Sequence, residues 1–420
     1  MEKKDLREKV QKTADILNNF DKFLNDTVCR IPGGKFITQD ILDKVRAEAK
    51  VLAEVLDNPR PPRFLLVGKT GVGKSSLINA MLGEYVAEVS SVSVGTKKAE
   101  VVPIEIDGKI VMEVIDTKGV FESIASGKGQ AEIELQEAIE KFKPDAALFV
   151  FRAKDRAHLD VDVRLIKEKL ASELVGVPLV VVVSQVDELD PAREKVEGEY
   201  SERKKSNIKQ AVEQVKAILD HEKLKYVSIV PVASYMEWQE VKMFDKIKKA
   251  CTFDGRYNID ELLDVLQNNM EIKAQIGLLL YTSSDRSLRK IATMIVNNIS
   301  GIASTIAVTP IPVADIFPLF ALQVAMVTII AYLAGKKLDF EGARDFILSL
   351  GIVGIGGYTF RTIARQLAKF IPLPGVGSVI GASVAYSGTS AIGNVAIAYY
   401  FDNVIDKSKL KDMFKLYLKK

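Results

Sequence analysis

The residues between positions 68 and 75 have the types and spacing that bind a phosphate group. Residues 64–67 are the apolar run Phe-Leu-Leu-Val, residues 68–75 are Gly-Lys-Thr-Gly-Val-Gly-Lys-Ser, and apolar side chains at helical spacing resume at Leu77. Several backbone N–H groups can point at one anion only where no Cβ obstructs the turn, and the N-terminus of a following helix adds partial positive charge. Lys74 would reach the β- and γ-phosphates, and the Ser75 hydroxyl would bind Mg²⁺. We therefore predict a strand, a phosphate-binding loop and a helix, with a nucleotide bound by Gly68, Lys69, Thr70, Gly71, Val72, Gly73, Lys74, Ser75 and Ser76.

Two more candidate residues follow a predicted strand at residues 109–115. They are Asp116 and Gly119, in the sequence Asp-Thr-Lys-Gly. Ligands of an open parallel sheet bind beyond the carboxyl ends of its strands. A carboxylate in that place can hold Mg²⁺ through a water, and a glycine N–H is free to meet a γ-phosphate. We predict that Asp116 helps to bind the metal and that Gly119 acts in catalysis with Lys74.

Residues at the ends of two later strands could recognise a base. Gln185 and Asp187 follow the predicted strand at 177–184, and Ala233 and Ser234 follow the one at 226–232. The Asp187 carboxylate could accept from both the ring N–H and the exocyclic amine of guanine, which adenine cannot match. The main chain at Ala233 and Ser234 could meet the guanine carbonyl. Each pattern is common by itself, but their order at successive strand ends reinforces the phosphate-binding loop.

Alternating strand and helix patterns between residues 59 and 275 would position these side chains. Such alternation predicts an α/β domain with a mostly parallel six-stranded sheet and helices on both faces. Strands are expected at 63–67, 99–106, 109–115, 145–151, 177–184 and 226–232, and helices at 75–82, 130–141, 160–174, 201–220 and 258–275. Asp107-Gly108 is a hairpin signal, so the second and third strands should be antiparallel. Residues 235–257 form a longer connection than usual, and the sequence assigns them no structure.

Composition limits the other classes of function. A net charge of +3 over 420 residues gives no sign of a nucleic-acid binder. Cys29 and Cys251 match no metal or redox spacing. The first residues have no apolar core of the signal-peptide kind, so we expect a cytoplasmic protein, with the inner face of the cytoplasmic membrane as a further location.

From 63 to about 270 the chain resembles translation-factor-class GTPases, in particular the Era-like branch and its septin-like, immunity-related and dynamin-like relatives. The residues 68–79, Gly-Lys-Thr-Gly-Val-Gly-Lys-Ser-Ser-Leu-Ile-Asn, are the most specific part of the resemblance. It implies GTP as substrate, Mg²⁺ as cofactor, and Thr96 as the threonine that closes on the metal and the γ-phosphate. Gly119 would begin the second switch.

The sequence departs from the family pattern around the base and the reacting phosphate. Gln185 stands where a lysine is usual, which predicts weaker base binding, and Lys118 replaces a common proline. Val120 stands where Ras-type enzymes have a glutamine that orients water, so hydrolysis should use another arrangement, either a water positioned by the backbone or a group supplied in trans by a second molecule. We expect slow intrinsic turnover that depends on a partner. Lys69 could supply that group in a homodimer formed through the nucleotide face, or could be a solvated loop lysine.

The two ends of the chain are predicted to be helical. Amphipathic helices are expected from Lys4 to about Asn25 and from Thr38 to Leu56. After about residue 289 charges become sparse, and residues 316–335 and 371–401 contain none. We expect the N-terminal helices to pack with this hydrophobic C-terminal third in an all-α domain. The predicted segments are 1–58, 59–275 and 276–420.

The sequence leaves open whether the C-terminal third enters a membrane. Residues 316–335 are long enough to span a bilayer. However, Asp315 and Gln323 would be costly in lipid, which favours a folded helical domain that associates with membrane lipids. The region resembles an uncharacterised helical domain attached to some bacterial Era-like GTPases, on the residues Thr-Pro-Ile-Pro-Val-Ala-Asp-Ile at 309–316 and Ile-Pro-Leu-Pro-Gly at 371–375. The basic amphipathic tail at 407–420 could lie on an anionic membrane or dock through its leucines.

These observations favour a GTP-hydrolysing switch whose nucleotide state alters a helical, membrane-associating domain. One alternative is an RNA- or ribosome-assembly GTPase, although no basic cluster interleaved with aromatic residues is present. A membrane-anchored scaffold that binds nucleotide with negligible turnover is a third hypothesis.

Overall fold

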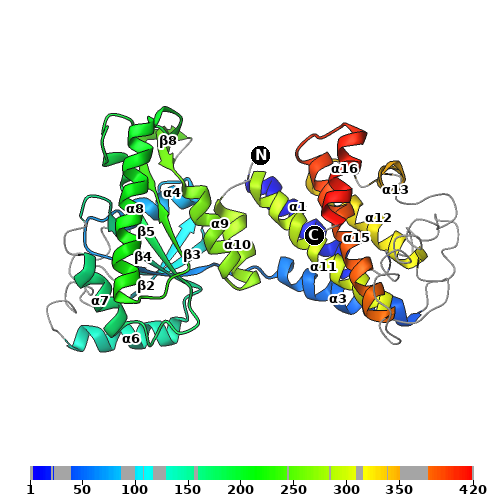
Figure 1. The fold of residues 1–420 in the computed structure, drawn as a ribbon, viewed down its shortest axis with the longest axis horizontal. Coiled ribbons are helices and arrows are strands. Elements are labelled where there is room, and N and C mark those ends of the chain that lie inside the picture. Colours follow the sequence, from blue (N-terminus) through cyan, green and yellow to red (C-terminus); the bar gives the residue numbers. More distant parts are fainter. Residues whose placement is uncertain are drawn as a thin grey trace. The chain divides into compact units, whose positions relative to one another are not determined.

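The computed structural model of the chain has two compact units (Figure 1). It describes residues 3–19, 22, 39–86, 100–106, 108–116, 129–155, 159–243, 246–282, 285–308, 316–337, 339–350 and 377–418. One unit is Pro59–Ser283, and the other joins Met1–Asn58 to Ser284–Lys420. The fold class expected from the sequence, an α/β nucleotide-binding domain with an additional all-α part, is confirmed. The exact limits of the three predicted segments stay a prediction.

The first unit is built on a six-stranded sheet with the order β2-β3-β1-β4-β5-β6. Its strands are β1 (Arg63–Val67), β2 (Glu100–Ile106), β3 (Lys109–Asp116), β4 (Ala146–Arg152), β5 (Leu179–Ser184) and β6 (Ser228–Pro231). All neighbours pair in parallel except β2 and β3, which form the expected antiparallel edge. The carboxyl ends of β1, β3, β4, β5 and β6 therefore lie along one edge of the sheet.

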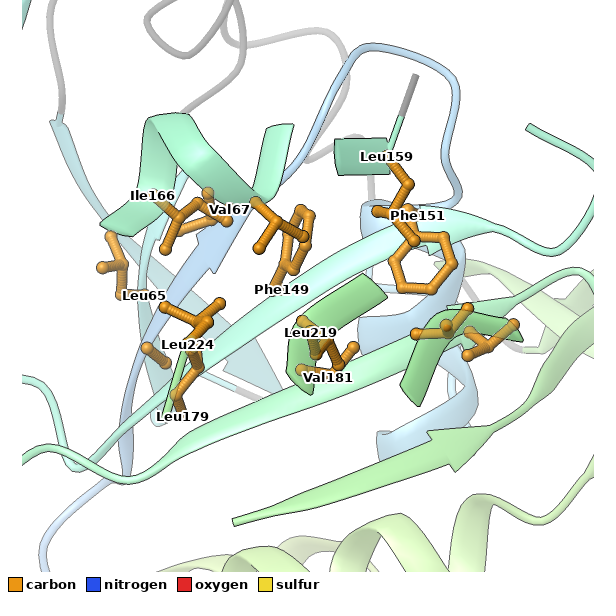
Figure 2. Packing of buried hydrophobic residues seen from close by; sticks show 14 of the residues in the cluster. Leu65, Val67, Phe149, Phe151, Leu159, Ile166, Leu179, Val181, Leu219 and Leu224 are labelled. Carbon is orange, nitrogen blue, oxygen red and sulfur yellow. The ribbon is translucent and has the colours of Figure 1, made fainter. Parts of the chain in front are cut away.

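Side chains of the central strands alternate between two apolar cores, one on each face of the sheet. In β1, Leu65 and Val67 pack into one core, while Phe64 and Leu66 pack into the other. Figure 2 shows the first core, where Phe149 and Phe151 of β4 lie with Val181 of β5. Period-two alternation with both faces covered is what a parallel sheet between two helix layers requires.

Two sets of helices cover these faces. Side chains of α6 (Gly129–Phe142), α7 (Leu159–Lys169) and α8 (Glu202–Glu222) pack into the first core, and those of α4 (Lys74–Leu82), α9 (Ile259–Asn269) and α10 (Ile272–Thr282) into the second. The single helix expected at 258–275 is two helices. Met270 has extended backbone angles at the end of α9, and its carbonyl accepts from the Gln275 side chain in α10. The chain therefore changes direction there.

The connection that the sequence left unassigned is a long antiparallel hairpin. It consists of β7 (Ala233–Met243) and β8 (Lys246–Tyr257), which pair from Ala233 with Tyr257 to Met243 with Lys246. Arg256 donates to the carbonyl of Ala80 in α4 at 3.0 Å. Trp238 contacts Tyr85 edge to face, with ring centroids 5.7 Å apart. The hairpin thus packs on the helix that follows the phosphate-binding loop.

The second unit contains helices from both ends of the chain. They are α1 (Lys3–Asn18), α3 (Gln39–Asp57), α11 (Asp285–Val308), α12 (Ile316–Leu333), α13 (Phe340–Ser349), α15 (Gly377–Tyr400) and α16 (Lys407–Leu418). Lys12 of α1 lies 5.2 Å from the Tyr332 ring centroid in α12, so the N-terminal helix packs with the hydrophobic third as expected.

The interior of this unit contains a polar pair as well as apolar side chains. Gln323 of α12, whose amide would be costly to bury in lipid, donates to the buried Thr389 of α15 at 3.1 Å. Leu410 and Phe414 of α16 are buried, so part of the apolar side of the tail is docked, as one of the two alternatives for this segment predicts. No helix among the described residues has the length and apolar character needed to cross a membrane.

Candidate functional site

The loop between β1 and α4 has the backbone that its glycines predict. Gly68, Gly71 and Gly73 have φ angles of 154°, 82° and 92°, which L-residues with a Cβ rarely adopt. A Cβ on Gly68 would lie 2.2 Å from the carbonyl oxygen of Val150 in β4, so any side chain there would collide with main chain. Gly73 directly precedes α4 and starts the helix in this left-handed conformation. The loop therefore turns tightly after β1, and its main chain at Gly68 packs directly against β4.

Lys74 is buried, and its side chain lies against the phosphate-binding loop. It is 6% exposed, and its ammonium donates to the carbonyls of Gly68 and Lys69 at 2.7 and 2.9 Å. Phosphate oxygens bound in this loop would meet the same ammonium group. Ser75 is half-buried and Ser76 exposed in the first turn of α4, where backbone N–H groups lack helical acceptors. Thr70 and Gly71 are exposed, and Val72 is buried.

Lys69 makes an ion pair that sequence reasoning missed. Its ammonium lies 2.7 Å from Oδ2 of Asp162 in α7, and Asp162 is 8% exposed. The lysine is therefore paired within its own chain, whereas the sequence analysis considered only solvation or a contact across a dimer. No local pattern links the two residues, because they come together only when α7 packs beside the loop.

The segment after β5, which contains two of the predicted base-binding residues, is hydrogen-bonded directly to the phosphate-binding loop. The buried Ser184 hydroxyl lies 2.7 Å from the carbonyl of Val72, and the Gln185 amide donates to the carbonyl of Gly71 at 3.2 Å. Arg152 in turn donates to the Gln185 side-chain oxygen at 2.6 Å. Gln185 has a φ of 57°, so it sits in a tight turn at the strand end. Although Gln185 replaces the usual lysine, it holds the two loops side by side.

Asp187 is buried at the end of this turn and already has a charged partner. It is 4% exposed, and its Oδ2 lies 2.7 Å from the ammonium of Lys195. The Lys195 ammonium also lies 5.3 Å from the centroid of the Tyr235 ring. Nothing in the local sequence around Asp187 identifies this partner.

A second lysine fixes the main chain around Asp187. Lys204 of α8 has no exposed surface, and its ammonium donates to the carbonyls of Asp187, Leu189 and Pro191 at 2.8, 3.0 and 3.0 Å. Burial lowers the pKa of Lys204, and the nearby Asp187 carboxylate opposes that shift. Three carbonyl acceptors around one ammonium hold the turn in a defined conformation.

The residues after β6 lie next to the Asp187 segment. Val186 donates its N–H to the carbonyl of Val232 at 3.2 Å, and Ala233 and Ser234 follow at the start of β7. Ala233 is buried. The Ser234 hydroxyl is buried and has no hydrogen-bond partner within the part of the chain that the structure describes. A bound base with a carbonyl acceptor would be able to satisfy it.

The predicted metal-binding residues are only partly within the described part of the chain. The Asp116 backbone pairs in register with Leu66, two residues before Gly68, so it ends β3 beside the loop. Thr96 and Gly119 lie outside the described residues, as do Lys118 and Val120. Where the structure describes the chain, no three His, Cys, Asp or Glu side chains cluster as metal ligands. The candidate donors, a hydroxyl and a carboxylate, are hard oxygen ligands of the kind Mg²⁺ prefers, with phosphate oxygens completing the set.

The strand order, the loop and the buried aspartate define Pro59–Ser283 as a P-loop nucleotide-binding domain of the GTPase class. Residues 63–185 match the model of a family described as 50S ribosome-binding GTPase. GTPase Der of Acidithiobacillus ferrooxidans is 32% identical over 156 residues, which are 36% of this chain and 32% of that protein. The match thus spans about a third of the length of this relative.

Solved structures with similar folds include two from different organisms. A dimerization-deficient mutant of Toc33 from Arabidopsis thaliana is 20% identical with a TM-score of 0.35, over 60% of this chain and 95% of that chain. LeoA, a bacterial dynamin GTPase from ETEC, is 15% identical with a TM-score of 0.37, over 98% of this chain and 70% of that chain.

Proposed function

We propose that this chain binds GTP with Mg²⁺ and hydrolyses it to GDP and phosphate. The main support is the direct connection between the two halves of the site: Ser184 and Gln185 contact the carbonyls of Val72 and Gly71. One nucleotide could therefore place its phosphates at Lys74 and its base at Asp187. The aspartate would accept from guanine, and the Ala233–Ser234 segment would meet the base carbonyl.

The residues of the loop would bind and orient the terminal phosphates. The ammonium of Lys74 and the backbone N–H groups at the start of α4 would lie against the charge that develops in transfer. Ser75 and Asp116, with Thr96 from the first switch, would hold Mg²⁺, which supplies charge neutralisation between the β- and γ-phosphates when bound. Gly119 would meet the γ-phosphate through its N–H.

Calorimetry with GTP, GDP and ATP, together with a phosphate-release assay, tests this function. The wild-type chain should bind GTP and GDP in preference to ATP. Lys74→Ala should lower turnover at least about a hundredfold, because it removes charge stabilisation in the transition state. Lys209→Ala, at an exposed position of α8, is the matched control and should behave as wild type. Preference for ATP, or turnover unaffected by Lys74→Ala, would contradict the proposal.

We further infer that turnover depends on a group supplied by a second molecule. Val120 cannot orient water by a hydrogen bond, and an arginine supplied in trans accelerates related reactions by roughly 10³–10⁵. Because Lys69 is paired with Asp162 in its own chain, it would have to leave that partner to act across a homodimer. Specific activity that rises with protein concentration would support a homodimer through the nucleotide face, and a constant value would count against it.

We also propose that the helical unit associates with membrane lipids at their surface. With Leu410 and Phe414 buried, α16 still carries Lys407, Lys409 and Lys411 on exposed positions. Lysines near an anionic bilayer each contribute about 1 kcal/mol of attraction. The full chain should float with phosphatidylserine vesicles at low salt and not with phosphatidylcholine vesicles, and a non-hydrolysable GTP analogue should change the bound fraction. A bound fraction that does not change with the nucleotide would favour the scaffold hypothesis.

The family model favours one other candidate function, binding to the large ribosomal subunit. The matched family is described by that activity. Sedimentation of the full chain with purified 50S subunits in the presence of the GTP analogue tests it. Co-sedimentation that requires the analogue would favour a ribosomal role over the membrane role.

A further inference from the structure

The Lys195 ammonium lies between the two segments that would flank a base. It is 2.7 Å from Oδ2 of Asp187 and 5.3 Å from the ring centroid of Tyr235, which directly follows Ala233 and Ser234. The side chain of Asp187 is 6% exposed and that of Lys195 is 33% exposed. A buried carboxylate thus has a partly exposed ammonium group as its partner.

This ion pair changes what the carboxylate can offer to a base. Guanine presents two donors, the ring N–H and the exocyclic amine, and each needs one carboxylate oxygen for a bidentate contact. Hypoxanthine lacks the exocyclic amine and therefore needs only one oxygen. While Lys195 is paired with Oδ2, the hydrogen bond from the exocyclic amine of guanine must share that oxygen with the ammonium group, whereas the ring N–H can use the other oxygen alone. Sharing one oxygen between two donors weakens the second hydrogen bond to guanine.

The surroundings allow the side chain of Lys195 to move while its backbone stays in place. The Lys195 carbonyl oxygen lies so close to β8 that a Cβ on Gly255 would be 2.9 Å from it. Lys204 holds the Asp187 turn through three carbonyls, so the carboxylate has a fixed position. In its paired position the ammonium also lies 5.3 Å from the centroid of the Tyr235 ring, which adds a cation–π attraction beside the ion pair.

We propose that Lys195 is a specificity-determining residue of the base site, which competes with the exocyclic amine of guanine for Oδ2 of Asp187. This inference rests on the proposed GTP-binding function. Guanine nucleotides then bind more weakly than they would to an Asp187 carboxylate without an ion-pair partner. The loss of affinity is larger for guanine than for hypoxanthine. The effect should be about three- to tenfold, the range of a partly exposed ion pair.

The test compares GDP and IDP dissociation constants for the full chain by calorimetry. Lys195→Met removes the charge but keeps an unbranched stem, so GDP should bind about three- to tenfold more tightly, with a smaller change for IDP. Lys195→Arg strengthens the pairing with a carboxylate and should weaken GDP binding. Lys209→Met is the matched control and should leave both constants unchanged. Thermal unfolding checks that each variant is folded, and the arginine variant gives an independent result if the methionine variant does not fold.

The outcomes separate this inference from the proposed function. GDP binding with an unchanged ratio of GDP to IDP affinity in both Lys195 variants overturns the inference and leaves the proposed function standing. Weaker GDP binding in Lys195→Met would mean that the lysine supports the base, and it overturns the inference as well. If neither the wild type nor any variant binds guanine nucleotides, both the proposed function and the inference fail.

Discussion

Lys204 is a fully buried lysine whose charge is compensated only by carbonyl groups and nearby acids. Its ammonium donates to three main-chain carbonyls and lies 4.8 Å from the ring centroid of Tyr200. A buried charge is costly unless it is fully hydrogen-bonded, and this one is arranged so that its bonds define the turn containing Asp187. At the scale of single residues, the turn that contains Asp187, where we propose that the base binds, is therefore held in place by the buried Lys204 ammonium.

The substitution Lys204→Met should destabilise the chain and weaken guanine-nucleotide binding together. The apolar side chain leaves buried carbonyls without donors, so we expect a loss of about 3 kcal/mol in the free energy of unfolding. Lys205→Met is the control, because Lys205 is exposed and pairs only with Glu202 on the helix surface at 2.9 Å. Its effect should stay below about 0.5 kcal/mol. Urea denaturation measures both, and equal effects of the two substitutions would contradict the structural role of Lys204.

At the scale of elements, the hairpin β7–β8 links the base segment to the helix of the phosphate-binding loop. β7 begins at Ala233 next to the proposed base contact, and Arg256 near the end of β8 reaches the carbonyl of Ala80 in α4. That carbonyl lies in the last turn of α4, where helix carbonyls lack intrahelical donors. The hairpin is therefore a structural connection between the two halves of the site.

Arg256→Met should loosen this connection without unfolding the sheet. Loss of the charged donor to Ala80 should lower the free energy of unfolding by about 1–2 kcal/mol. Hydrogen exchange should accelerate in β7 and at the end of α4, and it should change little in β4 and β5. Arg203→Met, at an exposed position of α8, is the matched control. Uniform acceleration across the sheet would show that the hairpin is not a separate element.

The ion pair between Arg256 and Asp254 predicts that stability depends on pH. Hydrogen bonds from Arg256 lower the pKa of Asp254, so the folded state favours the ionised carboxylate. That contribution is fully present above the unfolded pKa of about 3.9 and is lost as the pH falls through the lower folded pKa. The stability difference between wild type and Asp254→Asn should therefore be constant from pH 7 to about 5 and should shrink below about 4. Because both side chains are partly exposed, the difference itself should be small. Urea titrations at several pH values measure it, and a difference that grows on acidification would have the wrong sign.

At the scale of the whole molecule, each unit has its own apolar core. The core of the helical unit includes one polar pair, Gln323 with Thr389. Removing one partner of a buried hydrogen bond is costly when the group left behind has no other partner. It costs less when the group left behind can bond elsewhere. A threonine hydroxyl in a helix can bond to its own backbone, as Thr328 does with the carbonyl of Val324 at 2.8 Å. A buried glutamine amide has no such local acceptor.

We therefore expect Thr389→Val to destabilise the helical unit by about 1–3 kcal/mol and Gln323→Leu by less than about 1 kcal/mol. Calorimetric unfolding should show two transitions, and these substitutions should shift only one of them. GDP at a hundredfold excess over its dissociation constant should raise the free energy of unfolding of the other unit, Pro59–Ser283, by about 2.7 kcal/mol. A single transition that moves with both the substitutions and GDP would show that the units do not unfold separately.

The sequence by itself determined the elements whose chemistry is local. The glycines at 68, 71 and 73 predicted a tight turn that residues with a Cβ rarely form, and the continuous apolar runs of β1 and β5 predicted buried strands. It also gave the order of polar residues at strand ends, because parallel pairing brings those ends to one edge. Local backbone preference and side-chain period are sufficient for such predictions.

Only the tertiary structure decided which charged groups meet at that edge. The pairs Lys69 with Asp162 and Asp187 with Lys195, and the burial of Lys204, depend on how α7, α8 and the hairpin pack, and their sequence neighbours give no sign of them. The hairpin itself was missed because its strands are mostly polar and pair with each other alone, so burial imposes little alternation on them. Contacts between distant residues are set by the path of the chain, and that path emerges only when the cores of the two units are packed.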